Sequence, residues 1–416
     1  MDRRYFRLVC SKQDVPLVEE LLLAEGFEFE PVEFFPLARK LIRAPFSLGN
    51  SIAAFFGLIY IQDKSSMLPP LCLNPPKQSV VLDLCASPGS KTGMLAQLVG
   101  EEGLVIANEP NGTRLATLRQ NLLQTNLLNV VTTRYPGQEF PLDICSFDYI
   151  LLDVPCSGWG TVEKHPSVIK IWTEDKIGPL INLQKKLLAQ AASLLLPGGK
   201  LVYSTCTTNV LENEAQIEWA VKNLDLEIVP LPKVKGVEYE EEQKEFAAQD
   251  TLRIDGQKSD SQGFFIACLQ KKGEKQEIDS TPKKVAWQKA REKEFSPYTC
   301  LDKPEFGSFY NFEQKVFFLP DKAVSLLGDK IKWQGTYVGK NKKDKIIIHP
   351  RLRRLAPGYE KNRGLNISEI KTLKGLISGQ SLICPGQSRM ALPFYWKKMP
   401  LGWLKLKKER CFWSER

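Results

Sequence analysis

From residue 80 onward, short apolar runs alternate with amphipathic stretches, and this alternation constrains the fold more than any other feature. It predicts strands at 79–84, 104–107, 129–132, 147–153, 199–204, 226–229 and 263–268, with helices near 91–99, 112–124, 180–195 and 211–223. Near-continuous apolar strands separated by helices are typical of a parallel sheet covered on both faces. The sequence therefore predicts an α/β fold of the Rossmann-like, doubly wound kind.

A candidate ligand site follows the first of these strands. The run VVLDLCASPGSKT places a turn of small residues between that strand and a helix, where backbone N–H groups converge on bound ligands. The turn lacks G-x-G-x-x-G, and Cys85 and Ser90 stand where a P-loop needs glycine. Glu109 ends the second strand, where an acid can bind both hydroxyls of a ribose. These features favour a nucleoside-like ligand such as S-adenosylmethionine, with a structural turn or another nucleotide as alternatives.

Two cysteines end apolar runs in the same way, Cys156 in YILLDVPC and Cys206 in KLVYSTC. In the usual strand order 3-2-1-4-5 their strands are neighbours, so both thiols should enter one cleft beside the ligand turn. A thiolate that adds to cytosine C6 makes C5 nucleophilic toward a methyl donor. An ordinary thiol pKa of about 8.5 must then be lowered by the site. Asp153 could hold the cytosine N3/N4 edge, and Cys156 is placed to assist release.

The remaining cysteines are widely spread, and most are expected to be inert core residues. No C-x-x-C pair exists, and only two histidines are present, so we expect neither a zinc site nor a disulfide framework. No apolar run approaches the ~18 residues of a membrane span. The first residues are basic without a following hydrophobic block, which argues against a secretory signal. We therefore expect a cytoplasmic protein without metal or membrane contact.

The chain is expected to divide into four parts. These are a small α+β N-terminal segment of an RNA-binding type (1–56), the α/β domain (57–271), a linker (272–299) and a basic β-rich domain (300–416). The last part holds 24 Lys and Arg against 10 Asp and Glu, whereas the rest of the chain is slightly acidic. This asymmetry predicts a polyanion-binding appendage, although a solvated lysine-rich surface explains it equally well.

Within the basic part, two patterns could contact RNA. The arginines of HPRLRRLAP (351, 353 and 354) are expected to contact phosphates or to form a solvated face. The aromatic-rich tail PFYWKKMPLGWLKLKKERCFW could stack on unpaired bases or pack into a core. The residues alone leave both pairs of alternatives open.

Four stretches resemble the Nol/Nop/Sun family of RNA cytosine-C5 methyltransferases: LDLCASPGSKT, LLDVPCSGWGT, VYSTCTTNVLENE and SQGFFIACLQK. With GLIYIQDKSSMLPPLCL upstream, the resemblance spans about 57–271. DNA cytosine methyltransferases resemble it only at Pro-Cys, whereas the Thr-Cys after the next strand is typical of the RNA family. The pattern is most similar to the bacterial 16S ribosomal-RNA methyltransferase F branch, which ends in a PUA-like RNA-binding domain. One departure is Pro136, where the family has an acid; Glu139 is the nearby substitute.

The resemblance implies a class I methyltransferase fold that uses S-adenosylmethionine, with Cys206 as nucleophile and Cys156 as release thiol. It implies a cofactor pocket lined by Cys85, Ala86, Ser87, Pro88, Gly89, Ser90, Lys91, Glu109 and Asp153. The expected partner is 16S ribosomal RNA or the small ribosomal subunit, bound by a monomer with a PUA-like C-terminal domain. A transfer-RNA cytosine-C5 methyltransferase and an RNA-binding protein with an inactive methyltransferase fold remain the alternatives.

Overall fold

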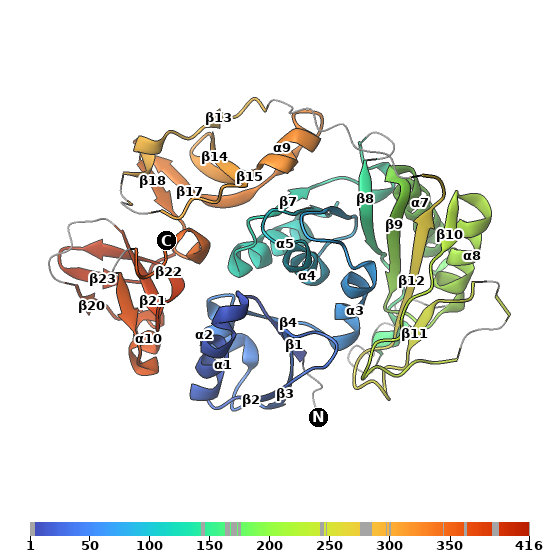
Figure 1. Ribbon diagram of the computed structural model, residues 1–416, viewed down its shortest axis with the longest axis horizontal. Coiled ribbons are helices and arrows are strands. Elements are labelled where there is room, and N and C mark those ends of the chain that lie inside the picture. Colours follow the sequence, from blue (N-terminus) through green and yellow to red (C-terminus); the bar gives the residue numbers. More distant parts are fainter. Residues whose placement is uncertain are drawn as a thin grey trace.

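The computed structural model describes 5–142, 146–162, 167, 173, 176–241, 245–246, 248–274, 285–296, 298, 301–343, 345–361, 364–384 and 391–415. Cys145 and Cys300 lie outside these residues. Over the described chain, a nine-stranded sheet forms the centre, with a four-stranded sheet and two five-stranded sheets around it (Figure 1). No helix of the described chain has the length and apolar character to cross a membrane.

The central sheet has the order β10-β12-β9-β8-β5-β6-β7-β16, with β11 beside β12. Its strands are β5 (Val80–Asp83), β6 (Leu104–Asn108), β7 (Val130–Thr133), β8 (Phe147–Asp153), β9 (Leu195–Thr205), β10 (Leu226–Ile228), β11 (Leu252–Ile254), β12 (Phe264–Lys271) and β16 (Trp333–Gln334). The five strands from β5 to β9 are parallel and follow the expected order 3-2-1-4-5. The predicted α/β fold with a mostly parallel sheet is confirmed.

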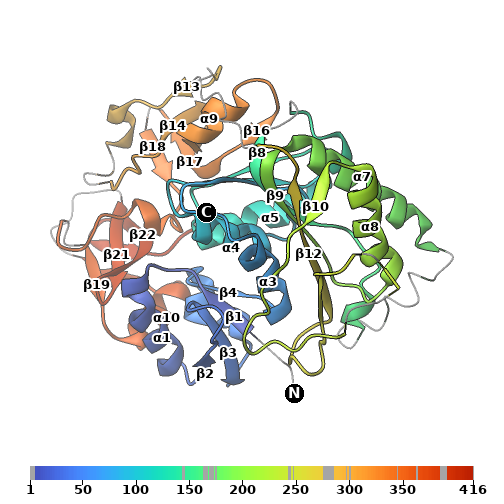
Figure 2. The same ribbon diagram turned by 45° about the vertical axis from the view of Figure 1, so that its right-hand side comes forward.

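Helices cover both faces of this sheet (Figures 1 and 2). One face packs against α7 (Gly178–Leu194) and α8 (Glu214–Asn223), the other against α3 (Lys64–Leu73), α4 (Ser90–Val99) and α5 (Gly112–Thr125). Side chains alternate between the two cores, since Leu82 joins the α7 face and Val81 the α4 face. Both faces are buried, which explains the apolar runs in the sequence.

The N-terminal unit, residues 5–61, contains a sheet of order β2-β3-β1-β4. Its elements are β1 (Tyr5–Leu8), α1 (Val15–Ala24), β2 (Glu28–Pro31), β3 (Ala38–Arg43), α2 (Ile52–Phe55) and β4 (Ile59–Ile61). Apolar residues of α1 and β1, such as Leu21 and Phe6, are fully buried together. The expected small α+β lead-in is thus a packed sheet-and-helix unit.

The C-terminal third forms two β-sheets, in agreement with the β-rich expectation. The first contains β13 (Gln288–Lys289), β14 (Gly307–Phe312), β15 (Lys315–Pro320), β17 (Thr336–Lys342) and β18 (Lys345–Ile348), with α9 (Asp321–Leu327) beside it. The second, the C-terminal sheet, contains β19 (Leu365–Ile367), β20 (Leu382–Ile383), β21 (Ala391–Trp396), β22 (Met399–Lys407) and β23 (Arg410–Phe412), with α10 (Ile370–Ile377). Because β13 pairs with β14, the first sheet begins inside the expected linker 272–299. The domain boundaries stay predictions.

The C-terminal sheet and the N-terminal unit share one hydrophobic core. Phe394, Trp396 and Leu401 are buried in the same cluster as Phe6 and the α1 leucines. The ring centroids of Phe56 and Phe394 lie 5.7 Å apart. The aromatic tail was expected either to stack on unpaired bases or to pack into a core. For these residues the structure supports packing into a core.

Arg353 corrects the sequence interpretation. The short helix that it begins, Arg353–Leu355, buries its side chain to 5% exposure. Its guanidinium donates to the carbonyl oxygens of Val9 (2.9 Å), Phe56 (2.8 Å) and Thr125 (3.2 Å). The expected phosphate contact at Arg353 is wrong, because its donors already join the N-terminal unit and α5 to the C-terminal third.

Candidate active site

Four neighbouring strands end at one edge of the central sheet and build the site. β5 ends at Asp83, β6 at Asn108, β8 at Asp153 and β9 at Thr205. Because parallel strands share their carboxyl edge, the turns that follow them lie next to one another. The structure thus brings together the turn 85–91, Glu109, Asp153 and both cysteines, as the sequence predicted.

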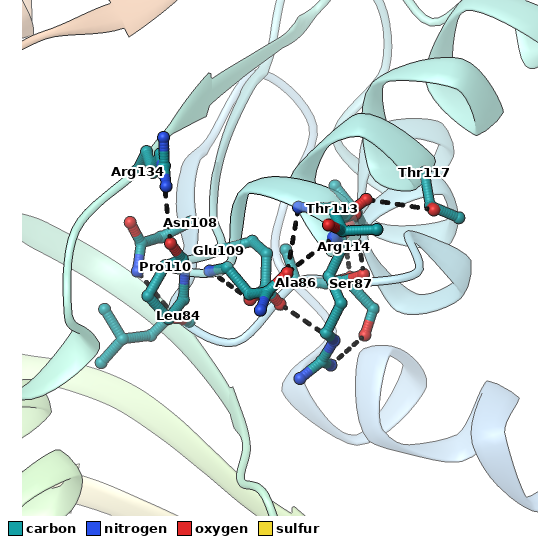
Figure 3. A network of polar contacts seen from close by, with 12 residues as sticks. Leu84, Ala86, Ser87, Asn108, Glu109, Pro110, Thr113, Arg114, Thr117 and Arg134 are labelled. Atoms are coloured by element: carbon teal, nitrogen blue, oxygen red, sulfur yellow. Dashed lines mark hydrogen bonds and ion pairs between the residues drawn. The ribbon is translucent and has the colours of Figure 1, made fainter.

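The turn between β5 and α4 has a backbone that requires glycine at one position. Gly89 has φ 106°, and a Cβ there would lie 2.8 Å from the Leu118 side chain. The turn is also tied to α5: the Ser87 hydroxyl donates to the Arg114 carbonyl oxygen (3.1 Å), and Arg114 Nη2 donates to the Ser87 carbonyl oxygen (3.2 Å) (Figure 3). These bonds fix the backbone N–H groups at the start of α4 before any ligand binds.

Glu109 lies at the mouth of this turn, and its side chain is only 2% exposed. Its Oε1 accepts from the Asn111 backbone N–H at 2.9 Å, and its Oε2 lies 3.5 Å from Arg114 Nε (Figure 3). Each carboxylate oxygen retains further lone pairs for other donors. The acid is therefore held in one orientation beside the turn.

Asp83, which the sequence analysis did not single out, is buried beneath the turn. Its Oδ2 accepts from the Thr92 hydroxyl at 2.6 Å, and its Oδ1 has no hydrogen-bond partner in the described structure. Burial raises the pKa of Asp83 to about 7. A buried carboxylate oxygen without a donor fits a ligand that brings one, such as the ammonium group of S-adenosylmethionine. The residues present thus fit the expected cofactor.

Lys91 connects the cofactor side of the site to the thiol side. Its Nζ lies 2.7 Å from Asp153 Oδ2, and it is 5.0 Å from the centroid of the Phe264 ring. The other carboxylate oxygen of Asp153, Oδ1, accepts from the Ser204 hydroxyl at 2.7 Å. Asp153 is therefore fixed between α4 and β9, with part of its carboxylate still exposed.

The two predicted cysteines are in contact. Cys156 Sγ and Cys206 Sγ lie 3.3 Å apart, and both thiols are free. The hydrogen bond from Cys156, with a smaller contribution from the Lys91 charge, lowers the pKa of Cys206 against the effects of burial and Asp153. The same hydrogen bond, together with burial, raises the pKa of Cys156. The opposite pKa shifts favour Cys206 as the thiol that ionises first, with Cys156 as its donor, whereas the 3.3 Å distance fits either direction of the hydrogen bond.

Backbone contacts fix the loop that carries Cys206. The Gly160 N–H donates to the Cys206 carbonyl oxygen at 3.0 Å, and the Gly263 N–H donates to the Gly160 carbonyl oxygen at 3.2 Å. A Cβ on Gly160 would lie 2.6 Å from the Gly263 carbonyl oxygen, so no larger residue fits. Three segments distant in sequence thus hold the thiol in place.

The sequence analysis also missed Glu212, a fully buried acid behind the two thiols. The only available signal was its place in VYSTCTTNVLENE, a stretch quoted for its cysteine and not for its acids. At the far side of the cofactor turn, Glu139, the suggested substitute for the acid absent at Pro136, is exposed in the short helix Gly137–Glu139. In the described residues no group of three or more His, Cys, Asp or Glu could hold a metal ion.

Known proteins resemble this chain over the region that contains the site. The family description "16S rRNA methyltransferase RsmB/F" matches residues 70–270. Ribosomal RNA small subunit methyltransferase F of Shewanella baltica (strain OS185) is 35% identical over 341 residues, covering 79% of this chain and 68% of the relative. The tRNA (cytosine(49)-C(5))-methyltransferase of Pyrococcus abyssi is 37% identical over 256 residues, covering 60% of this chain and 82% of the relative.

Solved structures show the same fold. A methyltransferase homolog protein from Pyrococcus horikoshii, 34% identical, superposes with a TM-score of 0.56 over 65% of this chain and 86% of its own. NSun6 from Pyrococcus horikoshii with SFG has a TM-score of 0.58 and covers 66% of this chain and 91% of its own. At 21% identity the second likeness concerns the fold alone.

The sheet order, with a ligand-binding turn after its first strand, defines a class I S-adenosylmethionine-dependent methyltransferase. Within this class, the family match over residues 70–270 and the relatives matched over most of their length identify the family. The chain belongs to the 16S rRNA methyltransferase RsmB/F family. It is an S-adenosylmethionine-dependent RNA cytosine-C5 methyltransferase.

Proposed function

We propose that this enzyme methylates C5 of a cytosine in ribosomal RNA, with Cys206 as the nucleophile and Cys156 as the release thiol. The observation that carries the proposal is the 3.3 Å contact between the two sulfur atoms. A reaction that uses two thiols in turn explains why both follow neighbouring strands beside the turn after β5. A methyltransferase for proteins or small molecules leaves the pair without a role.

In the proposed reaction, the Cys206 thiolate forms a bond to C6 of the cytosine, and C5 then attacks the methyl group. S-Adenosylmethionine supplies that methyl group as an electrophile. Asp153, held by Lys91 and Ser204, accepts from the cytosine N4 amino group and favours proton uptake at N3 as C6 is attacked. In the release step a water molecule accepts the C5 proton, the electron pair of the C5–H bond re-forms the C5=C6 double bond, and the C6–S bond breaks so that its electron pair returns to Cys206 as a thiolate. Cys156 lies in contact with that sulfur and assists the release.

The cofactor would be held by the residues around the turn. Backbone groups of Cys85, Ala86, Ser87, Pro88, Gly89 and Ser90 form its floor, and Glu109 accepts from the ribose hydroxyls. Lys91 and Asp153, which form an ion pair at 2.7 Å, would line the pocket on the side of the thiols. The orphan oxygen of Asp83 accepts from the ammonium group.

Ribosomal RNA is supported as substrate by the relative from Shewanella baltica, which covers more of this chain than the others described. The basic C-terminal third would bind phosphates through its exposed lysines. A second candidate is transfer RNA, which the 37% identity to the Pyrococcus abyssi enzyme favours. In either case the target cytosine must be unpaired or flipped, at a cost on the order of a few kcal/mol, because C6 of a paired and stacked base is not accessible to the Cys206 thiol. We propose a cytoplasmic monomer that needs no metal.

The proposal is tested by trapping. Cys156→Ala protein is incubated with total cellular RNA and S-adenosylmethionine, and the products are separated by denaturing electrophoresis. We expect a nuclease-sensitive, slowly migrating adduct that the additional change Cys206→Ala abolishes. Sequencing the trapped RNA distinguishes ribosomal from transfer RNA. Methyl transfer that survives Cys206→Ala would overturn the nucleophile assignment, and binding of RNA without any transfer by the wild type would favour an inactive fold.

A further inference from the structure

Glu212 is a buried acid that the proposed reaction does not use directly. It ends the short helix Val210–Glu212, six residues after Cys206, and its side chain has no exposure to solvent. A buried carboxylate is expensive unless several donors compensate it. The donors around Glu212 therefore indicate what the carboxylate holds in place.

Those donors come mainly from the loop that carries Cys156. Oε1 accepts from the Ser157 backbone N–H at 3.0 Å and from Gln184 Nε2 at 3.0 Å. Oε2 accepts from the Ser157 hydroxyl at 2.5 Å and from Asn209 Nδ2 at 3.3 Å. Gln184 Nε2, on α7, also donates to the Pro155 carbonyl oxygen at 3.0 Å. Both residues that flank Cys156 are thus fixed through one carboxylate.

The same network reaches the loop that carries Cys206. The Ser157 hydroxyl lies 2.8 Å from the Thr207 hydroxyl, and the Tyr203 hydroxyl donates to the Glu212 carbonyl oxygen at 2.6 Å. Ser157 follows Cys156 and Thr207 follows Cys206, so the bridge lies one residue behind the two sulfur atoms. All four of these side chains are buried.

We propose that Glu212 is a positioning residue that locks the two thiol-bearing loops together and thereby keeps Cys206, and not Cys156, the reactive thiol. This inference rests on the proposed function and adds the group that sets the roles of the two cysteines. Glu212 touches neither sulfur through a hydrogen bond; it acts through Ser157.

The charges around the thiols agree with this assignment. Glu212 raises the pKa of Cys156 by its negative charge, a smaller contribution than those of the hydrogen bond to Cys206 and burial. On the other side, the Lys91 charge favours the Cys206 thiolate and Asp153 opposes it. An anion behind Cys156 and a cation near Cys206 thus act in the same direction.

Glu214, two residues further on, provides a matched control. It is equally buried, but its two oxygens bind Arg253 at 2.7 Å each and do not contact Ser157. Replacing either acid by glutamine removes one buried charge from the same turn of chain. Because Arg253 also donates to the Thr208 carbonyl oxygen at 3.0 Å, Glu214→Gln can loosen the Cys206 loop but leaves the Ser157 link to Cys156 intact. A general loss of stability would therefore affect both variants, whereas a shift of reactivity to Cys156 is expected only in the first.

The experiment compares Glu212→Gln and Glu214→Gln in three measurements: thermal unfolding, labelling of the two cysteines by iodoacetamide at neutral pH with mass spectrometry, and methyl transfer. For wild type and Glu214→Gln we expect label on Cys206. For Glu212→Gln we expect the label to shift toward Cys156, and kcat to fall up to about 100-fold without a rise in KM, because the thiols are displaced from their working geometry.

Ser157→Ala tests the same lock from its other side and guards against misfolding of the Glu212 variant. It removes the hydroxyl link and leaves the carboxylate, so we expect a smaller fall in kcat and the same direction of label shift. The double variant should be no worse than Glu212→Gln alone, since both changes break one connection. Unchanged labelling and kcat in a folded Glu212→Gln or Ser157→Ala protein would overturn the inference. Methyl transfer that survives Cys206→Ala would instead overturn the proposed function.

Discussion

Two buried charged side chains, Glu212 behind the thiols and Arg353 between the ends of the chain, solve the same physical problem in different places. Glu212 accepts from a backbone N–H, a hydroxyl and two side-chain amides, which belong to the two thiol-bearing loops and to α7. Arg353 donates to backbone carbonyl oxygens of the N-terminal unit and α5. Replacing Glu212 should therefore change the rate of methyl transfer, whereas replacing Arg353 should change the free energy of unfolding. The comparison separates residues that order the reaction from residues that hold the parts together.

The sharpest test at the catalytic edge is Cys206→Ala. We expect methyl transfer to fall on the order of 10⁴-fold or more, because the proposed covalent step needs the thiolate. The melting temperature should hardly change, since only one small, partly exposed side chain is shortened. A single-turnover assay with RNA and a thermal scan measure both. A large loss of stability would instead show that Cys206, like Arg353, has a structural role.

The corresponding test at the junction is Arg353→Met. The variant leaves several buried carbonyl oxygens without donors, so the free energy of unfolding should fall by about 3 kcal/mol or more. Denaturant unfolding measures the loss. Arg354→Met is the matched control, because the interaction that the described residues give the Arg354 side chain is a surface ion pair with Glu101, worth about 1 kcal/mol or less. Equal effects of the two changes would contradict the role given to Arg353.

A third test concerns cofactor binding. Glu109→Gln keeps the shape of the side chain and removes the charge that would accept from two ribose hydroxyls. We expect the dissociation constant of S-adenosylmethionine to rise about 10- to 100-fold, the loss of one or two charge-assisted hydrogen bonds. Calorimetric titration of the protein without RNA gives this constant. The same affinity in the variant would mean that Glu109 serves only to orient Asn111 and Arg114.

The smallest expected effect is a pH dependence of stability from Asp83. Burial raises the pKa of Asp83 from 3.8 to about 7, so the folded state holds a proton that the unfolded state releases. The stability that this proton contributes is present below pH 4 and is lost as the pH rises to about 7. Between pH 5 and pH 8, the melting temperature of the wild type should fall by about 1 to 3 °C more than that of Asp83→Asn. If the melting temperatures of the wild type and Asp83→Asn change equally with pH, Asp83 does not titrate in this range.

The strands of the central sheet could be predicted from the sequence, because they are buried on both faces and turn residues mark their ends. Both thiols and Glu109 could be placed for the same reason: each follows a strand whose neighbours the usual order predicts. Glu212 and Asp83 could not be placed, since a buried acid is recognisable only by donors that folding brings to it. Arg353 was misread because a run of arginines has the same pattern whether it faces solvent or backbone carbonyls.

The start of strand β9 was also misplaced. The strand begins at Leu195 and not at 199, since its pairing with β8 resumes after an irregularity between Phe147 and Tyr149. Gly198, with φ 74°, lets the chain pass through this irregularity. Propensity alone suggests a turn at PGG, because Pro and Gly are rare inside strands. The pairing partner, which is distant in sequence, decides otherwise.

The core shared by the N-terminal unit and the C-terminal sheet has a consequence for synthesis. A ribosome makes Phe6 and Phe56 early, yet their partners Phe394 and Leu401 are added only when the chain has grown past residue 391. Until then the apolar side chains of the first sheet lack these partners, and exposed apolar surface of this kind favours aggregation. The parallel sheet, by contrast, has all of its catalytic strands by residue 205. The active-site edge is therefore complete in sequence long before the two ends of the nascent chain can meet.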